Sequence, residues 1–289
     1  MKPRIFACTW TLQPLMGPVE AARFASTHAF EGLEIQSNLL DFWPGPGSER
    51  LLRELCAIGK NEGLRYTFYG QAALNPAAHA PESRHANAEM VKHAIATAVA
   101  LSSPLLSVHP GVVSELATLE RHGLPYATSR FDRTQLLREG WQRAVETLAQ
   151  WAELAADAGL LLTIENEAHV RHTAAPTASS LAAMIDAIGR PNVRVNFDTG
   201  HAFIGEGLLQ ELAVLRPHIG HLHLNDNRGN VSEHLPLGAG AADFPAIADF
   251  LASVDAALVL EIYAPKRPVE ASLESRAYLT ALFRGIVDR

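Results

Sequence analysis

Four apolar runs of the chain end in side chains that can bind a metal ion or move a proton. LLLTIE ends at Glu165, VRVNFD at Asp198, IGHLH at His223 and LVLE at Glu261. Three carboxylates and an imidazole form an oxygen-rich ligand set that suits Mn²⁺, Mg²⁺ or Co²⁺ and does not exclude Zn²⁺. Because only 19% of the residues are charged, four ionisable residues at the ends of four apolar runs are hard to explain as ordinary surface residues. The four residues are therefore predicted to hold one divalent metal ion.

Two structural alternatives use the same residues without a metal. In the first, Asp198 only caps the helix that follows it in a solvated turn. In the second, the three acids belong to a buried network paired with Arg194, Arg228 and Lys266. A metal site makes a different prediction: without a cation, the clustered carboxylates repel one another, and either the pKa of at least one of them rises or the site loosens.

The runs that end in these residues belong to a regular alternation of extended and helical patterns. Extended runs are expected at residues 5–9, 32–36, 65–69, 104–109, 160–165, 193–198, 219–226 and 257–263, each followed by a helical pattern. Such alternation requires parallel pairing with helical crossovers, and eight units of this kind close into a barrel. The chain is therefore predicted to be α/β, a single (β/α)8 TIM barrel domain over residues 1–289.

In a barrel of this kind the active site forms at the carboxyl ends of the strands. Side chains alternate along a strand, so His221, His223 and Asn225 in HLHLND share one face. His223 lies nearer the mouth and is the predicted ligand. His221 lies one layer deeper and is predicted to be a hydrogen-bonded histidine of the barrel interior.

Composition excludes several other classes of protein. The formal net charge is -7, and no run of Lys and Arg is long enough to follow a phosphate backbone, which argues against a nucleic-acid binder and for a small polar ligand. No apolar stretch approaches the roughly 18 residues that span a bilayer. The segment MKPRIFACTW is expected to form a first strand rather than a signal peptide, and a cytoplasmic location is expected. Cys8 and Cys56 are expected to be reduced and buried. The sequence leaves a homo-oligomer open.

Several short motifs, taken together, resemble those of a known superfamily. They are DTGH at 198–201, HLHLNDN at 221–227, HLPLGAG at 234–240 and VHPG at 108–111. As a set they resemble the xylose-isomerase-like barrels, and the likeness spans essentially the whole chain. That group contains sugar-phosphate isomerases and epimerases, ketose 3-epimerases, inosose dehydratase-type lyases and metal-dependent apurinic-site endonucleases.

The resemblance implies a metal-dependent isomerase or epimerase of a small sugar, polyol or sugar phosphate. The metal would be held by the four residues named above. Glu165 and Glu261 would also exchange protons with the substrate carbon from opposite faces of a metal-bound enediolate. His201 would reach a substrate oxygen or a second metal.

Other residues are predicted to contact the substrate. Arg228 matches a family position that contacts substrate oxygens, and the aromatic face of Trp10 either stacks on a sugar or caps the barrel core. The complete predicted set of substrate contacts is His201, His109, Arg228, His234, Trp10 and Tyr69.

Three departures from family patterns keep other functions open. Arg171 stands where ketose 3-epimerases carry a substrate-binding Glu, which argues against a free ketose bound in that manner. Tyr69 and Ser232 replace two ligands of the trinuclear endonucleases, so a three-zinc cluster is not expected. The alternatives are a lyase or dehydratase of a keto-sugar or inosose, an endonuclease-like phosphodiesterase, and a non-catalytic sugar-binding relative.

Overall fold

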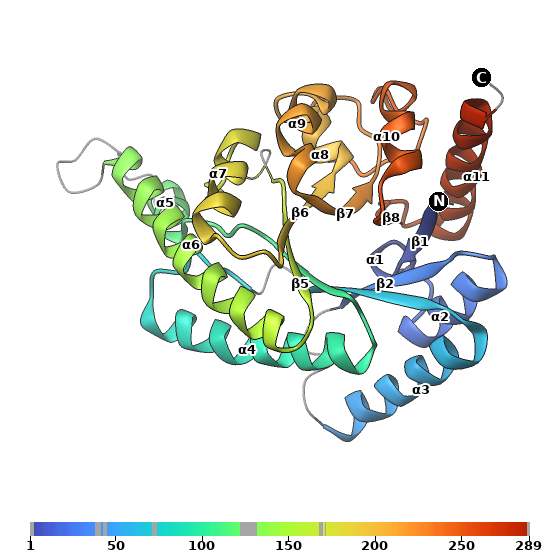
Figure 1. Ribbon diagram of the computed structural model, residues 1–289, viewed down its shortest axis with the longest axis horizontal. Helices are drawn as coiled ribbons and strands as arrows, with labels where there is room; N and C mark the ends of the chain where they lie inside the picture. Colours follow the sequence, from blue (N-terminus) through green and yellow to red (C-terminus); the bar gives the residue numbers. More distant parts are fainter. Residues whose placement is uncertain are drawn as a thin grey trace.

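The eight apolar runs form parallel strands, and the helical segments between them return the chain to the same end of the sheet each time (Figure 1). The computed structural model describes residues 3–37, 42, 45–70, 74–121, 132–167, 170 and 172–287. Each strand pairs with the next in sequence and the first pairs with the last, so that Phe6 lies opposite both Gly32 and Val259. The predicted (β/α)8 TIM barrel is confirmed.

The strands are short and buried, as expected where both faces of a sheet are covered. They are β1 (Arg4–Cys8), β2 (Gly32–Ser37), β3 (Arg65–Gly70), β4 (Leu105–Val108), β5 (Leu161–Glu165), β6 (Val193–Asp198), β7 (Ile219–Leu224) and β8 (Ala257–Leu260). The last strand ends earlier than predicted, so Glu261 follows β8 directly instead of lying within it.

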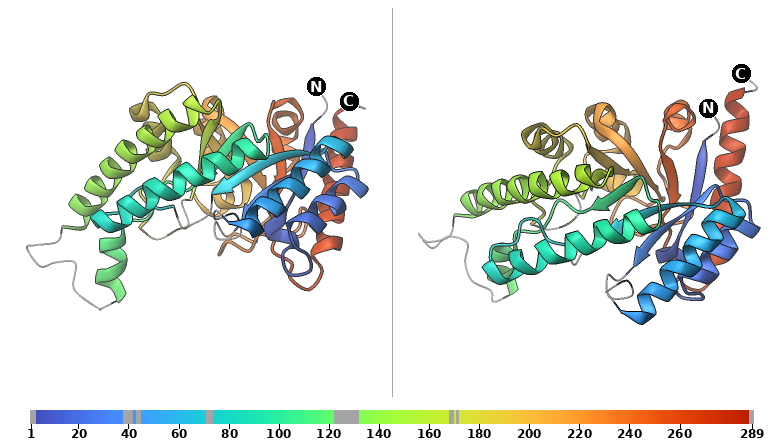
Figure 2. Two further views of the ribbon diagram at one scale, coloured as in Figure 1. Left: turned by 90° about the horizontal axis from the view of Figure 1, so that it is seen from below. Right: turned by 60° about the horizontal axis from the view of Figure 1, so that its bottom comes forward.

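Helices cover the outer face of the barrel, and Figure 2 shows the long helices α3, α4 and α6 along its outside. Beside η2 (Arg216–His218) and η3 (Pro245–Ile247), the helices are α1 (Thr9–Leu12), α2 (Pro18–Thr27), α3 (Pro46–Glu62), α4 (Pro81–Ala100), α5 (Ser114–Arg121), α6 (Arg133–Asp157), α7 (Ala178–Ile188), α8 (Thr199–Ile204), α9 (Leu208–Leu215), α10 (Ala248–Ser253) and α11 (Pro268–Val287). β1 starts close to the end of α11 (Figures 1 and 2).

Two helices end near glycines whose backbone is in the left-handed region. Gly159 follows α6 with a φ of 74°, and Gly189 ends α7 with a φ of 63°, both in the left-handed region that glycine tolerates. The connection after β4 contains α5. Residues 122–131 of that connection lie outside the described part of the chain.

The core has two parts. A large apolar layer separates the strands from the helices, and a small cluster of Phe6, Cys8, Ala257 and Val259 fills part of the barrel interior. The predicted burial is correct for Cys8 and wrong for Cys56, which is partly exposed because it lines an open cavity. Both thiols are free.

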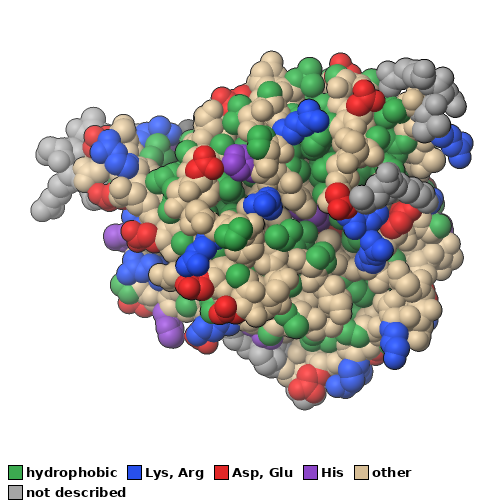
Figure 3. Space-filling view, in the orientation of Figure 1, with side chains coloured by type: hydrophobic (Ala, Val, Ile, Leu, Met, Phe, Trp, Pro, Cys, Tyr) green, Lys and Arg blue, Asp and Glu red, His purple; other side chains and the backbone are tan. Residues whose placement is uncertain are grey.

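The surface carries no obvious basic band on the face shown in Figure 3, where Lys and Arg side chains are scattered among acidic ones. Among the described helices, none combines the length and apolar character required to cross a bilayer.

Candidate metal centre and active site

Four consecutive strands bring the predicted ligands together at their carboxyl ends. Ligand atoms of Glu165, Asp198, His223 and Glu261 all lie within 4.8 Å of one another. The residues come from β5, β6 and β7 and from the position that follows β8, and all four are buried. Residues separated by about a hundred positions therefore form one cluster, because neighbouring parallel strands end at the same rim.

Asp198 both caps a helix and belongs to the buried cluster. Its Oδ1 accepts a hydrogen bond from the backbone N–H of His201 at 2.7 Å, which caps α8, and its Oδ2 accepts one from Asn225 Nδ2 at 2.7 Å. Its backbone N–H donates to Asn166 Oδ1 at 2.7 Å. The residue has no solvent exposure, so the alternative of a solvated capping turn is wrong.

His223 presents its two ring nitrogens to different carboxylates. Nε2 donates to Glu34 Oε1 at 2.7 Å, inside the barrel. Nδ1 lies 3.2 Å from Glu261 Oε2 and 3.5 Å from Glu165 Oε1. His221, one layer deeper, donates from Nε2 to Glu34 Oε2 at 2.6 Å, as predicted for an interior histidine.

In the absence of a cation, histidines balance the charge of the cluster. Burial acts to raise the pKa of Glu165 and of Glu261, but the neighbouring histidines, His223 with His201 at Glu165 and His223 with His234 at Glu261, together lower the pKa of each. Burial acts to lower the pKa of His223, yet the surrounding carboxylates raise it well above its usual value. The pKa of Asp198 is raised, chiefly by burial.

The cluster fits a divalent cation. Three carboxylates and one imidazole supply the donors, and Glu261 Oε2 has no hydrogen-bond partner among the described residues. Among the described residues, no network of arginine-paired acids forms: Arg194 donates to the carbonyl of Val193, and Arg228 pairs with Glu233. Within the described chain, the ion pairs recorded for the three acids are with histidines.

Two predicted substrate residues, His201 and His234, meet on one side of the cluster, where their Nε2 atoms are 3.3 Å apart. His201 Nδ1 donates to the carbonyl of Asn166 at 3.0 Å, and His234 Nδ1 donates to the carbonyl of Glu261 at 3.1 Å. Burial acts to lower the pKa of His201, but Asp198 and Glu165 raise it to about 10. The ring of Trp10 contacts His234 edge-on at 5.1 Å between centroids.

Tyr69 and His109 lie on the other side of the cluster. Tyr69 donates its hydroxyl proton to Glu165 Oε2 at 2.5 Å, and His109 Nε2 hydrogen bonds to the same hydroxyl. His109 Nδ1 pairs with Glu167. Burial acts to lower the pKa of His109, but Glu167 outweighs it and raises the pKa. Glu165 is thus tied through Tyr69 to a histidine that is partly open to solvent.

Arg228 is not brought to the cluster. Its side chain is 61% exposed and binds Glu233 at 2.6 Å, so its predicted contact with substrate oxygens stays a prediction. Arg171, the departure from the ketose 3-epimerase pattern, lies outside the described residues.

The sequence alone assigned no role to several residues that hold the ligands in place. Gln36 Nε2 donates to Glu261 Oε1, and Asn166 fixes the end of β6 while donating to Glu211 Oε2 at 3.1 Å. The signal was present in GLEIQS, where Glu34 and Gln36 alternate with apolar residues and must face the barrel interior. The residues whose positioning contacts only the structure shows are Glu34, Gln36, Asn166, Glu167 and Asn225.

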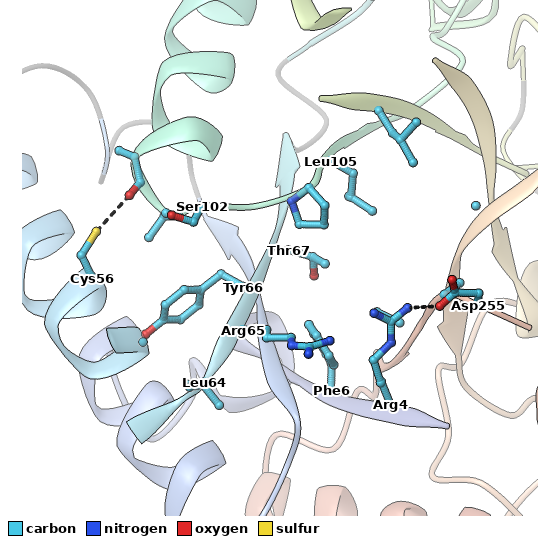
Figure 4. Close-up of a pocket in the computed structure, with 18 of the residues that line it drawn as sticks. Arg4, Phe6, Cys56, Leu64, Arg65, Tyr66, Thr67, Ser102, Leu105 and Asp255 are labelled. Carbon is cyan, nitrogen blue, oxygen red and sulfur yellow. Dashed lines mark hydrogen bonds and ion pairs between the residues drawn. The ribbon is translucent and has the colours of Figure 1, made fainter. Parts of the chain in front are cut away.

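A cavity of about 820 Å³ lies at the opposite end of the barrel (Figure 4). Arg4, Arg65 and Leu105, which start three of the strands, line it together with Tyr66, and Arg4 pairs with Asp255 at 2.7 Å. None of the predicted site residues lines this cavity. Because the amino-terminal face of such barrels serves stability rather than chemistry, the carboxyl-terminal cluster is the candidate active site.

Fold and cluster together define a (β/α)8 barrel protein with a candidate metal site at the carboxyl ends of its strands. The chain belongs to the xylose isomerase-like TIM barrel family, whose sequence model matches residues 22–282.

Curated relatives match parts of the chain. An uncharacterized protein of Methanocaldococcus jannaschii, MJ1311, is 29% identical over 59% of this chain and 54% of its own length. An L-ribulose 3-epimerase of Mesorhizobium japonicum is 32% identical over 40% of this chain and 38% of its own length. An inosose dehydratase of Erwinia tasmaniensis is 37% identical over 32% of this chain and 31% of its own length. The chain thus spans about half or less of each of these relatives.

Solved structures match the whole fold. The crystal structure of a D-tagatose 3-epimerase-like protein superposes with a TM-score of 0.76 at 22% identity, covering 99% of this chain and 100% of the other. A probable 3-DHS dehydratase of Bacillus anthracis, AsbF, superposes with a TM-score of 0.72 at 18% identity, covering 96% and 98%. These likenesses establish the barrel architecture.

Proposed function

We propose that this protein is a divalent-metal-dependent isomerase or epimerase of a small sugar, polyol or sugar phosphate. The observation that carries the proposal is the convergence of Glu165 and Glu261, from β5 and the end of β8, on one buried cluster with Asp198 and His223. Two carboxylates at one site are what proton removal and return at a carbon require.

The four cluster residues would hold the cation. When bound, the cation would polarise a substrate carbonyl and its neighbouring hydroxyl and acidify the C–H bond between them. The chain's own groups then move the proton. Gln36 occupies Glu261 Oε1, which leaves Oε2 as the oxygen able to take or give a proton. On the opposite carboxylate, Tyr69 occupies Glu165 Oε2, which leaves Oε1 facing the cluster.

Substrate oxygens would meet the histidines on both sides of the cluster. His201 and His234 form one polar wall, with Trp10 beside it, and His109 with Tyr69 forms the other. Walls with polar tips and aromatic faces suit a polyhydroxylated ligand. Names of the relatives support the same substrate class, since they include an L-ribulose 3-epimerase.

A lyase or dehydratase is the second candidate. Such an enzyme uses the same proton removal but expels a β-hydroxyl group, which requires a proton donor beside the carboxylates. His201, hydrogen bonded to His234 next to Asp198, supplies one. Partial matches to an inosose dehydratase and the barrel likeness to a probable 3-DHS dehydratase also favour this candidate.

The test is to add a panel of ketoses, inososes and sugar phosphates to metal-replete protein in D₂O and to follow deuterium at carbon by NMR. An isomerase or epimerase incorporates solvent deuterium into a product of unchanged elemental formula. A product that lacks one water molecule relative to its substrate supports the dehydratase instead.

Two further outcomes would contradict both candidates. Metal stoichiometry near three, with cleavage of DNA at abasic sites, would support an endonuclease-like phosphodiesterase. Bound metal and ligand without exchange anywhere in the panel would indicate a sugar-binding relative.

A further inference from the structure

Glu34 is a fully buried carboxylate of β2 that contacts two histidines of β7 from across the barrel interior. Its Oε1 accepts from His223 Nε2 at 2.7 Å. Its Oε2 accepts from His221 Nε2 at 2.6 Å and from the hydroxyl of Thr67 at 3.1 Å. These short N–O distances are typical of charge-assisted hydrogen bonds. The Glu34 carboxylate therefore accepts hydrogen bonds from both imidazoles.

The two oxygens of Glu34 have different surroundings. Oε2 is held by two donors, His221 and Thr67, from different strands. Oε1 is directed at His223. Thr67 of β3 and His221 of β7 therefore orient the carboxylate independently of His223. The other oxygen, Oε1, then determines where the N–H group of His223 must lie.

This arrangement decides which nitrogen of His223 carries a proton when the ring is neutral. A carboxylate only accepts, so Nε2 must be the N–H, and the lone pair is left on Nδ1. Nδ1 is the atom that faces Glu165 and Glu261, at 3.5 and 3.2 Å. Asn196 Nδ2 lies 3.3 Å from both ring nitrogens and so does not favour either tautomer.

We propose that Glu34 is a positioning residue that orients the ring of His223 and fixes its tautomer, so that Nδ1 is available to the metal. This inference rests on the proposed metal-dependent function. It assigns to β2 a contribution to the site that does not involve contact with metal or substrate. Partners of this type around metal-bound histidines typically contribute 10- to 100-fold to metal affinity.

The first test is Zn²⁺ binding by Glu34→Gln, measured by calorimetry together with thermal unfolding. Glutamine keeps the shape but replaces one acceptor oxygen by a donor, so one of the two histidines must change its tautomer or lose its partner. We expect Zn²⁺ affinity to fall about 10- to 100-fold. The matched control is Asp255→Asn, the same change of carboxylate to amide at the opposite end of the barrel, where Asp255 pairs with Arg4, and we expect it to leave Zn²⁺ affinity unchanged.

The second test needs no variant at Glu34. In ¹⁵N-histidine-labelled, Zn²⁺-loaded wild-type protein, NMR should show His223 with its proton on Nε2 and its Nδ1 bound to metal, the signal being assigned by its loss in His223→Asn. A proton on Nδ1 overturns the inference even if Glu34→Gln fails to fold.

The outcomes separate this inference from the function on which it rests. Wild-type protein that binds neither Zn²⁺ nor Mn²⁺ overturns both. Wild-type protein that binds metal, with Glu34→Gln binding it equally well, overturns the role of Glu34 and leaves the proposed function standing.

Discussion

The three acids of the cluster differ in their partners, and their proton affinities differ accordingly. Glu165 and Glu261 face His223, which lowers the pKa of each against the effect of burial. One carboxylate oxygen of Asp198 caps α8 and the other accepts a hydrogen bond from Asn225. Burial raises the pKa of Asp198. Because the groups interact strongly, removal of one changes the protonation of the others.

Asp198→Asn should separate the structural and the metal-binding roles of this residue. Asparagine is as good a helix cap as aspartate, so α8 should persist. Asparagine cannot supply the negative charge, so metal affinity should fall by at least about 100-fold. This loss is larger than the loss typical when a residue that only positions a metal ligand is replaced. Metal content after dialysis measures this, with circular dichroism to check the fold. Unchanged metal content would remove Asp198 from the ligand set.

Glu261→Gln should affect proton transfer more than metal binding. The amide oxygen can still accept from Gln36, which preserves the local structure. A neutral amide cannot exchange a proton with carbon, so deuterium incorporation should fall by about 10²- to 10⁴-fold. Single-turnover exchange in D₂O measures the effect. Exchange at the wild-type rate would show that Glu261 has no part in the chemistry.

Glu211 makes stability depend on pH. It is fully buried beneath Asn166, and burial raises its pKa. A carboxyl with a raised folded-state pKa contributes stability that is fully present below its unfolded pKa of about 4.3 and is lost as pH rises through the folded value. The free energy of unfolding of wild type minus that of Glu211→Gln should therefore fall as pH rises above the unfolded pKa of about 4.3. Urea denaturation at each pH tests this, and a difference that rises with pH would contradict it.

At the scale of elements, the turn from β6 into α8 passes close to the end of β7. A Cβ added to Gly200 would lie 1.8 Å from Asn225 Oδ1 and 2.2 Å from Asn227 Nδ2. Asn225 also holds Asp198. Only a residue without a side chain permits this approach, so the DTGH motif positions a ligand through packing as well as through charge.

Gly200→Ala should therefore weaken both the fold and the metal site, with a loss of about 2 to 4 kcal/mol in the free energy of unfolding and reduced metal binding. Gly285→Ala in α11 is the matched control, because its Cβ would meet no atom of the described residues within 4 Å. Alanine there should stabilise by about 0.5 to 1 kcal/mol through helix propensity. Denaturant unfolding of both variants measures the contrast. Similar effects at both positions would argue against the close approach.

At the scale of the molecule, the cluster joins β5, β6, β7 and β8 and so couples metal binding to closure of the barrel. A ligand that binds only the folded state stabilises it by mass action. At a free metal concentration 100 times Kd this amounts to about 2.7 kcal/mol, or a rise of about 5 °C in Tm for a chain of this size.

Thermal scans with Mn²⁺, Mg²⁺, Co²⁺ or Zn²⁺, and then with a chelator, should show this rise and its reversal. Asp198→Asn is the control and should show no shift. A Tm independent of all four ions would contradict a metal site that involves four strands.

The sequence by itself determined the barrel and the four clustered residues. Regular alternation of short apolar runs and helical patterns permits little but parallel strands with crossovers, and parallel strands carry their last residues to one rim. That is why Glu165, Asp198, His223 and Glu261 were predictable from local pattern, although Glu261 lies about a hundred positions from Glu165.

Only the tertiary structure decided how these residues are held. The contacts of Glu34 with His223 and of Gln36 with Glu261 join segments that no local pattern relates, since they depend on which side chains face each other across the barrel interior. The same holds for Arg228, which the structure places in an exposed pair with Glu233. Periodicity along a strand fixes the face on which a side chain lies, but its hydrogen-bond partner is set by closure of the barrel.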